Sequence, residues 1–64
     1  MTFCKCLFET HKGNKTVSAW ENWNKFARAP YYEICVSVNG LVMETYKTAR
    51  TTWSRKFNEV CSAI

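Results

Sequence analysis

The chain has little of the residue types on which most catalytic and nucleotide-binding sites depend. It has one histidine, no aspartate, and two glycines, Gly13 and Gly40, that stand far apart in 64 residues. A phosphate-binding loop needs several glycines in close succession, so nucleotide binding of that kind is excluded. Nucleophilic catalysis needs a base held beside the nucleophile, and the single histidine, His11, is predicted to lie in a solvated turn. We therefore predict that the protein is not an enzyme and holds no cofactor.

Long apolar runs are also absent. No segment approaches the roughly 20 apolar residues that a membrane span needs, and the first seven residues lack the basic start and apolar run of a signal peptide. We expect a cytoplasmic protein that does not enter membranes. In that reducing setting the four cysteines would be thiols, and their spacing is not that of a structural zinc site, so we predict no metal. They are Cys4, Cys6, Cys35 and Cys61.

What the chain does contain is apolar and aromatic surface. Hydrophobic residues make up 47% and aromatic residues 16% of the sequence, which favours a folded chain over a disordered one. Sixty-four residues allow one small core, so we predict a single domain over 1–64. The net charge of +4 is compatible with nucleic acid or with an acidic protein as partner.

The stretch 31–48 predicts a β-hairpin around Asn39-Gly40, the dipeptide that best tolerates the positive φ angles of a tight type I′ turn. Such a turn pairs residues whose numbers sum to 79. One face would then carry Ile34, Val36, Val38, Leu41 and Met43, and we expect this face to be the core. The outer face would carry Tyr31, Cys35, Val42 and Tyr46, ringed by Glu33 and Glu44.

Periodicity predicts the other elements. Residues 2–10 alternate as a strand, with Cys4, Cys6 and Phe8 on the side expected to be buried. A turn follows over 11–14, and 15–17 would pair back as a short strand. The sequence Ser18-Ala19-Trp20-Glu21 has the form of a capping box and predicts a helix from Ala19 to Arg28.

A second helix is predicted to follow Thr48 as N-cap and to run to the end of the chain. Its apolar stripe would be Ala49, Trp53, Phe57, Val60 and Ile64. The predicted fold is therefore an α+β two-layer sandwich, in which an antiparallel hairpin sheet of three or four strands carries two amphipathic helices on one face. The order would be β-(β)-α-β-β-α, with the short strand in brackets.

Two classes of macromolecular partner follow from the predicted surfaces. Tyrosine-centred patches with polar rims are typical of protein interfaces, so we predict that a protein partner, or a second copy of the chain in a homodimer, binds at Tyr31, Glu33, Glu44 and Tyr46. The alternative is an RNA- or single-strand-binding module that uses a basic rim. This rim would consist of Lys12, Lys15, Lys47, Arg50, Arg55 and Lys56.

In size, chemistry and lack of a catalytic site, the chain resembles small accessory proteins of phages and mobile elements. These include inhibitors of host enzymes and of bacterial defence systems, anti-CRISPR proteins among them. The resemblance is one of general character and no motif carries it. It implies a non-catalytic protein that docks on a macromolecule, most often a protein, and modulates or inhibits it.

Overall fold

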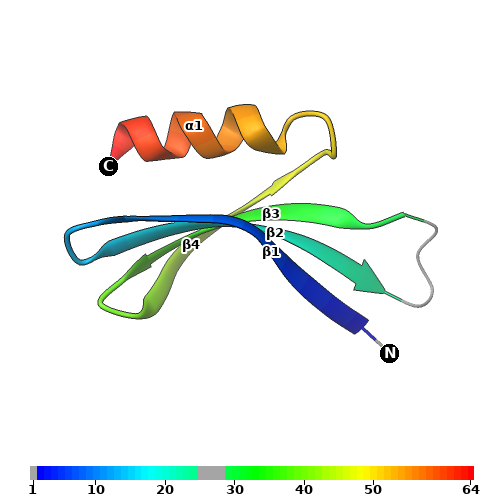
Figure 1. The fold of residues 1–64 in the computed structure, drawn as a ribbon, viewed down its shortest axis with the longest axis horizontal. Coiled ribbons are helices and arrows are strands. Elements are labelled where there is room, and N and C mark those ends of the chain that lie inside the picture. Colours follow the sequence, from blue (N-terminus) through cyan, green and yellow to red (C-terminus); the bar gives the residue numbers. More distant parts are fainter. Residues whose placement is uncertain (1, 25–28) are drawn as a thin grey trace.

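The computed structural model describes residues 2–24 and 29–64 and shows four strands followed by one helix (Figure 1). Each strand pairs antiparallel with the next one along the chain, in the order β1-β2-β3-β4, so β1 and β4 are the edges of the sheet. The helix lies across one face of this meander. The elements are β1 (Thr2–Lys12), β2 (Lys15–Asn24), β3 (Tyr31–Val38), β4 (Leu41–Thr48) and α1 (Trp53–Ala63).

The predicted sandwich with two helices is wrong, because the segment predicted as the first helix belongs to β2 as far as Asn24. Ser18 and Glu21, predicted to cap that helix, accept hydrogen bonds from tryptophan side chains instead. Ser18 Oγ accepts a hydrogen bond from Trp20 Nε1, and Glu21 accepts one from Trp23 Nε1, both at 2.8 Å. Residues two apart share one face of a strand, so these bonds suit extended backbone. The remainder of the predicted helix, 25–28, lies outside the described residues.

The predicted hairpin turn is confirmed, and its predicted register is correct only near the turn. Asn39 and Gly40 both have positive φ, at 52° and 83°, as a type I′ turn requires. Val38 pairs with Leu41 and Ser37 with Val42, and then a β-bulge at Met43 shifts the register, so that Val36 faces Glu44 and not Met43. Each later residue of β4 is thereby moved to the opposite face of the sheet from the predicted one.

The core lies between α1 and the two central strands. Val17 and Ala19 of β2 and Ile34 and Val36 of β3 are buried beneath Phe57 and Val60 of α1. Trp53 and Ile64 pack against this cluster, so the predicted apolar stripe of the last helix is confirmed over 53–64. Leu41 and Met43, predicted to be core residues, are 69% and 63% exposed, because α1 packs on β2 and β3 and leaves the tip of the β3–β4 hairpin uncovered.

The helix begins later than predicted, at Trp53, with Thr52 and not Thr48 in the N-cap position. Thr48 instead ends β4, and the chain reverses between strand and helix through a turn in which the Thr52 and Trp53 N–H groups both donate to the Ala49 carbonyl at 3.1 Å. At the other end, Lys12 Nζ donates to the carbonyls of Cys61 and Ile64, at 2.9 and 3.4 Å. This contact ties the first hairpin to the end of the helix.

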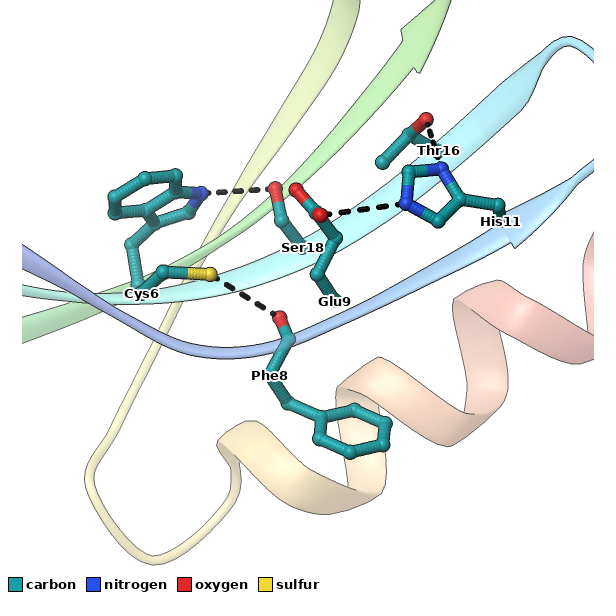
Figure 2. Close-up of polar contacts among 7 residues, drawn as sticks. Cys6, Phe8, Glu9, His11, Thr16 and Ser18 are labelled. Carbon is teal, nitrogen blue, oxygen red and sulfur yellow. Dashed lines mark hydrogen bonds and ion pairs between the residues drawn. The ribbon is translucent and has the colours of Figure 1, made fainter.

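A second bulge lies in β1, at Leu7, between the pairs that Cys6 and Phe8 make with β2. Leu7 packs against the core, and the Phe8 ring meets the Phe57 ring edge-on with 5.3 Å between centroids. Figure 2 shows Phe8 pointing towards the helix. Cys4 and Cys6 are exposed and Phe8 is itself 56% exposed, so the prediction that these three residues share a buried side is wrong. The bulge at Leu7 places Phe8 on the sheet face opposite to that of Cys4 and Cys6.

Candidate functional site

The four residues predicted to bind a partner belong to β3 and β4, but the structure does not bring them onto one face. Tyr31 and Glu33 lie on the sheet face turned away from α1, which we call the open face. Glu44 and Tyr46 lie on the helix side, opposite Val36 and Ile34. The bulge at Met43 is the cause, because it changes which face the following residues occupy. The sheet itself therefore separates the two halves of the predicted site.

On the open face, Tyr31 and Glu33 already have partners within the chain. Tyr31 is 45% exposed, and Lys47 Nζ lies 5.6 Å from the centroid of its ring, a cation–π arrangement. Glu33 accepts a hydrogen bond from Asn22 Nδ2 at 2.8 Å and pairs across the strands with Lys47. This end of the open face is an ordered polar and aromatic surface, with a charge of each sign.

A groove separates β4 from α1 on the helix side. The helix packs on β2 and β3, so the side chains of β4 are covered only along one flank. The groove has a volume of about 250 Å³ and is lined by both apolar and charged side chains. Its lining includes Val36, Glu44, Tyr46, Lys56, Glu59, Val60 and Ile64. A volume of this size suits one or two side chains of a partner better than a small-molecule ligand.

Charges in the groove are linked through Tyr46. The Tyr46 hydroxyl donates a hydrogen bond to the Glu44 carboxylate, which raises the pKa of Tyr46 because loss of its proton would leave two negative groups in contact. Lys56 Nζ lies 4.6 Å from the centroid of the same ring and 3.5 Å from Glu59. The groove therefore holds two carboxylates and one ammonium group, which already has two partners.

Three consecutive large apolar residues project at the tip of the β3–β4 hairpin. Leu41, Val42 and Met43 are exposed by 69%, 63% and 63%, and we call them the apolar tip. The tip is fixed in place, because the Asn39 N–H donates to the Asn14 carbonyl of the neighbouring β1–β2 turn at 2.9 Å. The sequence placed Leu41 and Met43 in the core. Leu41 keeps its predicted pairing with Val38, so the missed bulge accounts for the exposure of Met43 but not for that of Leu41.

The six residues of the predicted basic rim fall into separate groups. Lys12 and Lys15 lie at the β1–β2 turn, near the C-terminal end of α1, where Lys12 is bonded to helix carbonyls. Near the other end of α1, a second hollow of about 400 Å³ has Lys47, Arg55 and Lys56 in its lining. Arg50 is exposed in the turn before α1. The predicted continuous rim is therefore not formed, and three cations remain together.

A hydrogen-bonded row on the open face was not predicted from the sequence. His11 Nδ1 lies 3.0 Å from Thr16 Oγ1, and its Nε2 lies 3.3 Å from Glu9 Oε1 (Figure 2). The register that pairs His11 with Thr16 across the turn creates this contact. Acid, base and hydroxyl follow one another as in a nucleophilic triad, but the histidine and glutamate side chains are 66% and 48% exposed on an open sheet surface. Such a row lacks the enclosure that would activate the hydroxyl.

Within residues 2–24 and 29–64, no group of three or more His, Cys, Asp or Glu side chains is placed to hold a metal ion. The same residues include no helix with the length and apolarity of a membrane span. Comparison with known proteins gives no matching family model, no matching curated protein and no matching solved structure. Function is therefore inferred from the geometry of the chain itself.

Proposed function

We propose that the chain is a small non-catalytic binding protein that docks on a protein partner through the apolar tip and the adjoining strand β4. The observation that carries the proposal is the exposure of Leu41, Val42 and Met43, at 63–69%, on a hairpin tip held in place by a hydrogen bond to the neighbouring turn. Adjacent large apolar side chains on the surface of a small domain mark sites of interaction. Methionine and aromatic residues are enriched in such interfaces.

Polar side chains around β4 complete the surface. The side chains of Glu44 and Tyr46 project from β4 on the helix side. Tyr31 and Lys47 lie together on the open face, near the C-terminal end of β4. The surface therefore joins an apolar end to a polar stretch, and protein interfaces combine apolar and polar regions of this kind. By covering a surface of its partner, a domain of this size would inhibit or modulate that partner. This mode of action is the one expected of the small phage and mobile-element proteins that the chain resembles in general character.

Affinity capture with matched variants tests the docking surface. The double variant Leu41→Ser with Met43→Ser should lose a partner that the wild-type protein retains after nuclease treatment. The control Phe3→Ser removes a comparably exposed apolar side chain, 59% exposed, from the distant edge strand β1 and should retain the partner. Circular dichroism of each variant establishes that it is folded. A partner that the folded double variant still captures would contradict the proposal.

Nucleic-acid binding is the second candidate, and one observation favours it. Lys47, Arg55 and Lys56 line the same hollow of about 400 Å³ together with one acid, Glu59, which pairs with Lys56. The excess of positive charge there could meet a phosphate backbone. Binding of this kind to single-stranded RNA should fall steeply as salt rises and should be lost on Lys47→Glu with Arg55→Glu. Lys12→Glu with Lys15→Glu is the charge-matched control at the opposite end of α1. Absent or salt-insensitive binding would remove this candidate.

A further inference from the structure

We propose that β4 accepts an extended segment of a protein partner as a fifth strand of the sheet, with a Lys or Arg side chain of that segment in the groove between β4 and α1. This inference rests on the proposed docking function and specifies how the partner is held. Addition of a strand to an exposed sheet edge is a recurrent mode of peptide recognition, in which main-chain hydrogen bonds give affinity and side-chain pockets give specificity.

The outer edge of β4 is suited to receive a strand. β4 pairs on one side with β3, and in the part of the chain that the structure describes no strand pairs with its other side. Its eight residues, LVMETYKT, include neither proline nor glycine, and after the bulge Glu44–Thr48 pair with β3 in unbroken register. A regular edge of this kind presents unpaired N–H and C=O groups.

The opposite edge, β1, is less suited to pairing. Its bulge at Leu7 lies in the middle of the strand and interrupts the regular spacing of its backbone groups. Charged lysines, which oppose pairing with another chain, occur on both edges, at Lys5 on β1 and at Lys47 on β4. Each edge offers stretches of five regular residues, and the edges differ because only that of β4 lies beside the groove lined by Glu44 and Tyr46.

A strand added to β4 would place alternate side chains on the helix side, next to Glu44 and Tyr46. Neighbouring strands lie about 4.8 Å apart, so such a side chain would enter the groove of about 250 Å³ between β4 and α1. The apolar walls at Val60 and Ile64 suit the aliphatic stem of a long side chain. The groove thus provides the side-chain pocket that strand addition needs for specificity.

Charge determines which side chain fits best. Glu44 and Glu59 place two carboxylates at the groove, whereas its one ammonium group, on Lys56, already lies 3.5 Å from Glu59 and 4.6 Å from the centroid of the Tyr46 ring. A Lys or Arg of the partner would meet the Glu44 carboxylate, whose own neighbour is a neutral hydroxyl. An acidic side chain would instead face two negative charges.

A second copy of the chain is the less favoured occupant. Two copies of β4 could pair antiparallel so that the helix-side faces of both sheets stay on the same side. If Thr45 of one copy lies opposite Thr45 of the other, Met43 lies opposite Lys47. If instead Tyr46 lies opposite Tyr46, Thr45 lies opposite Lys47 and the apolar tip extends beyond the paired segment. Neither arrangement buries the apolar tip against apolar surface.

The test uses a display library of random octapeptides selected on the immobilised full chain, followed by fluorescence polarisation with the enriched peptides. We expect enriched peptides to combine β-branched residues with a Lys or Arg at a fixed position. Glu44→Lys should weaken their binding by roughly tenfold or more, because a charge-assisted contact is replaced by repulsion. Glu9→Lys, on β1, is the charge-matched control and should leave the affinity unchanged. Glu59→Gln gives a second readout from the helix side of the groove.

N-methylation of the peptide distinguishes strand addition from other contacts. Because only every second N–H of an added strand points to β4, methylation of one alternate set of amides should abolish binding and methylation of the other should not. Equal effects of the two sets, or no enrichment of peptides, would overturn the proposal. Concentration-dependent dimers in sedimentation that Glu44→Lys dissociates would also overturn it, in favour of a second copy.

The outcomes separate this inference from the proposed function. If the double variant of the apolar tip loses the captured partner while the two methylated peptide sets behave alike, docking stands and strand addition fails. If the folded tip variant keeps its partner, docking through the tip fails whatever the peptides show.

Discussion

The hydroxyl of Tyr32 donates a hydrogen bond to the Glu21 carboxylate at 2.6 Å across the paired strands β2 and β3. Trp23 Nε1 donates to the same carboxylate at 2.8 Å. The two bonds, that of Tyr32 foremost, hold the pKa of Glu21 below its ordinary value of 4.5. In return, the carboxylate raises the pKa of Tyr32, whose side chain is buried.

This pair predicts a loss of stability in acid. A carboxylate whose pKa is lowered on folding stabilises the protein fully above its unfolded value, and this contribution is lost as pH falls through the lower folded value. Thermal midpoints of the wild type and Tyr32→Phe should therefore differ at neutral pH and converge as pH falls below 4.5. Tyr31→Phe, at the neighbouring exposed tyrosine, should show no such convergence. A difference for Tyr32→Phe that is constant with pH would contradict the role given to Glu21.

Phe57 should be the most sensitive side chain of α1. It is 5% exposed in the core, so Phe57→Ala should lower the free energy of unfolding by about 3–5 kcal/mol. A domain of this size has a total of roughly 3–10 kcal/mol, so much of the variant should be unfolded at room temperature. Phe8→Ala removes the ring that meets Phe57 edge-on but is 56% exposed, and should cost about 1 kcal/mol. Urea denaturation followed by circular dichroism measures both, and equal losses would show that Phe57 is not central.

Replacement of Thr48 by valine should stabilise the protein against unfolding. Its Oγ1 is buried without a hydrogen-bond partner among the described residues, so Thr48→Val removes an unsatisfied polar atom and keeps the β-branched shape. We expect the free energy of unfolding to rise by about 1 kcal/mol. The same substitution at Thr52, whose Oγ1 accepts from the Ala49 N–H at 3.2 Å, should lower it. Urea denaturation of the two variants should therefore give shifts of opposite sign.

Lys12 should stabilise the end of the helix. Its ammonium group donates to the carbonyls of Cys61 and Ile64, where a positive charge is favoured at a helix C-terminus. Lys12→Met should lower the free energy of unfolding by about 0.5 kcal/mol at low salt, and the loss should shrink as salt is added. Lys15→Met removes the same charge from the adjacent strand and should have a smaller effect. Equal losses for the two variants would point to net charge and not to the helix contact.

Local signals in the sequence predicted those parts of the fold that local chemistry decides. Asn39-Gly40 determined the turn, because few other dipeptides accept two positive φ angles. The spacing of Phe57, Val60 and Ile64 determined the packed face of α1. Both features depend on residues close together in the chain, and both were confirmed.

Features that depend on neighbouring strands were missed. Ser18 and Glu21 match a helix start, yet their side chains bind indole N–H groups once β2 is held between β1 and β3. Aromatic residues such as Trp20 and Trp23 favour strands when a sheet is available to pack them. Tertiary context thus overrode a local pattern that was itself well formed.

The candidate site was missed because the predicted pairing of β3 with β4 was wrong by one residue after Val42. The bulge at Met43 moved Glu44 and Tyr46 from the predicted outer face to the groove beside Lys56. Side chains alternate with a period of two along a strand, so one extra residue transfers each later side chain to the other face. No composition or spacing in the hairpin sequence distinguishes the bulged from the regular arrangement.

The order of strands in the meander also has a consequence for how the chain folds. Each strand pairs with the strand that precedes it in sequence, so the sheet can assemble by forming hairpins whose connecting loops are short. Among the described elements, α1 alone packs on strands that are not adjacent to it in the chain, β2 and β3. Topologies dominated by local pairing fold rapidly for their size. We therefore expect the hairpins to form early and the packing of α1 onto β2 and β3, which buries Phe57, to be the late, slow step.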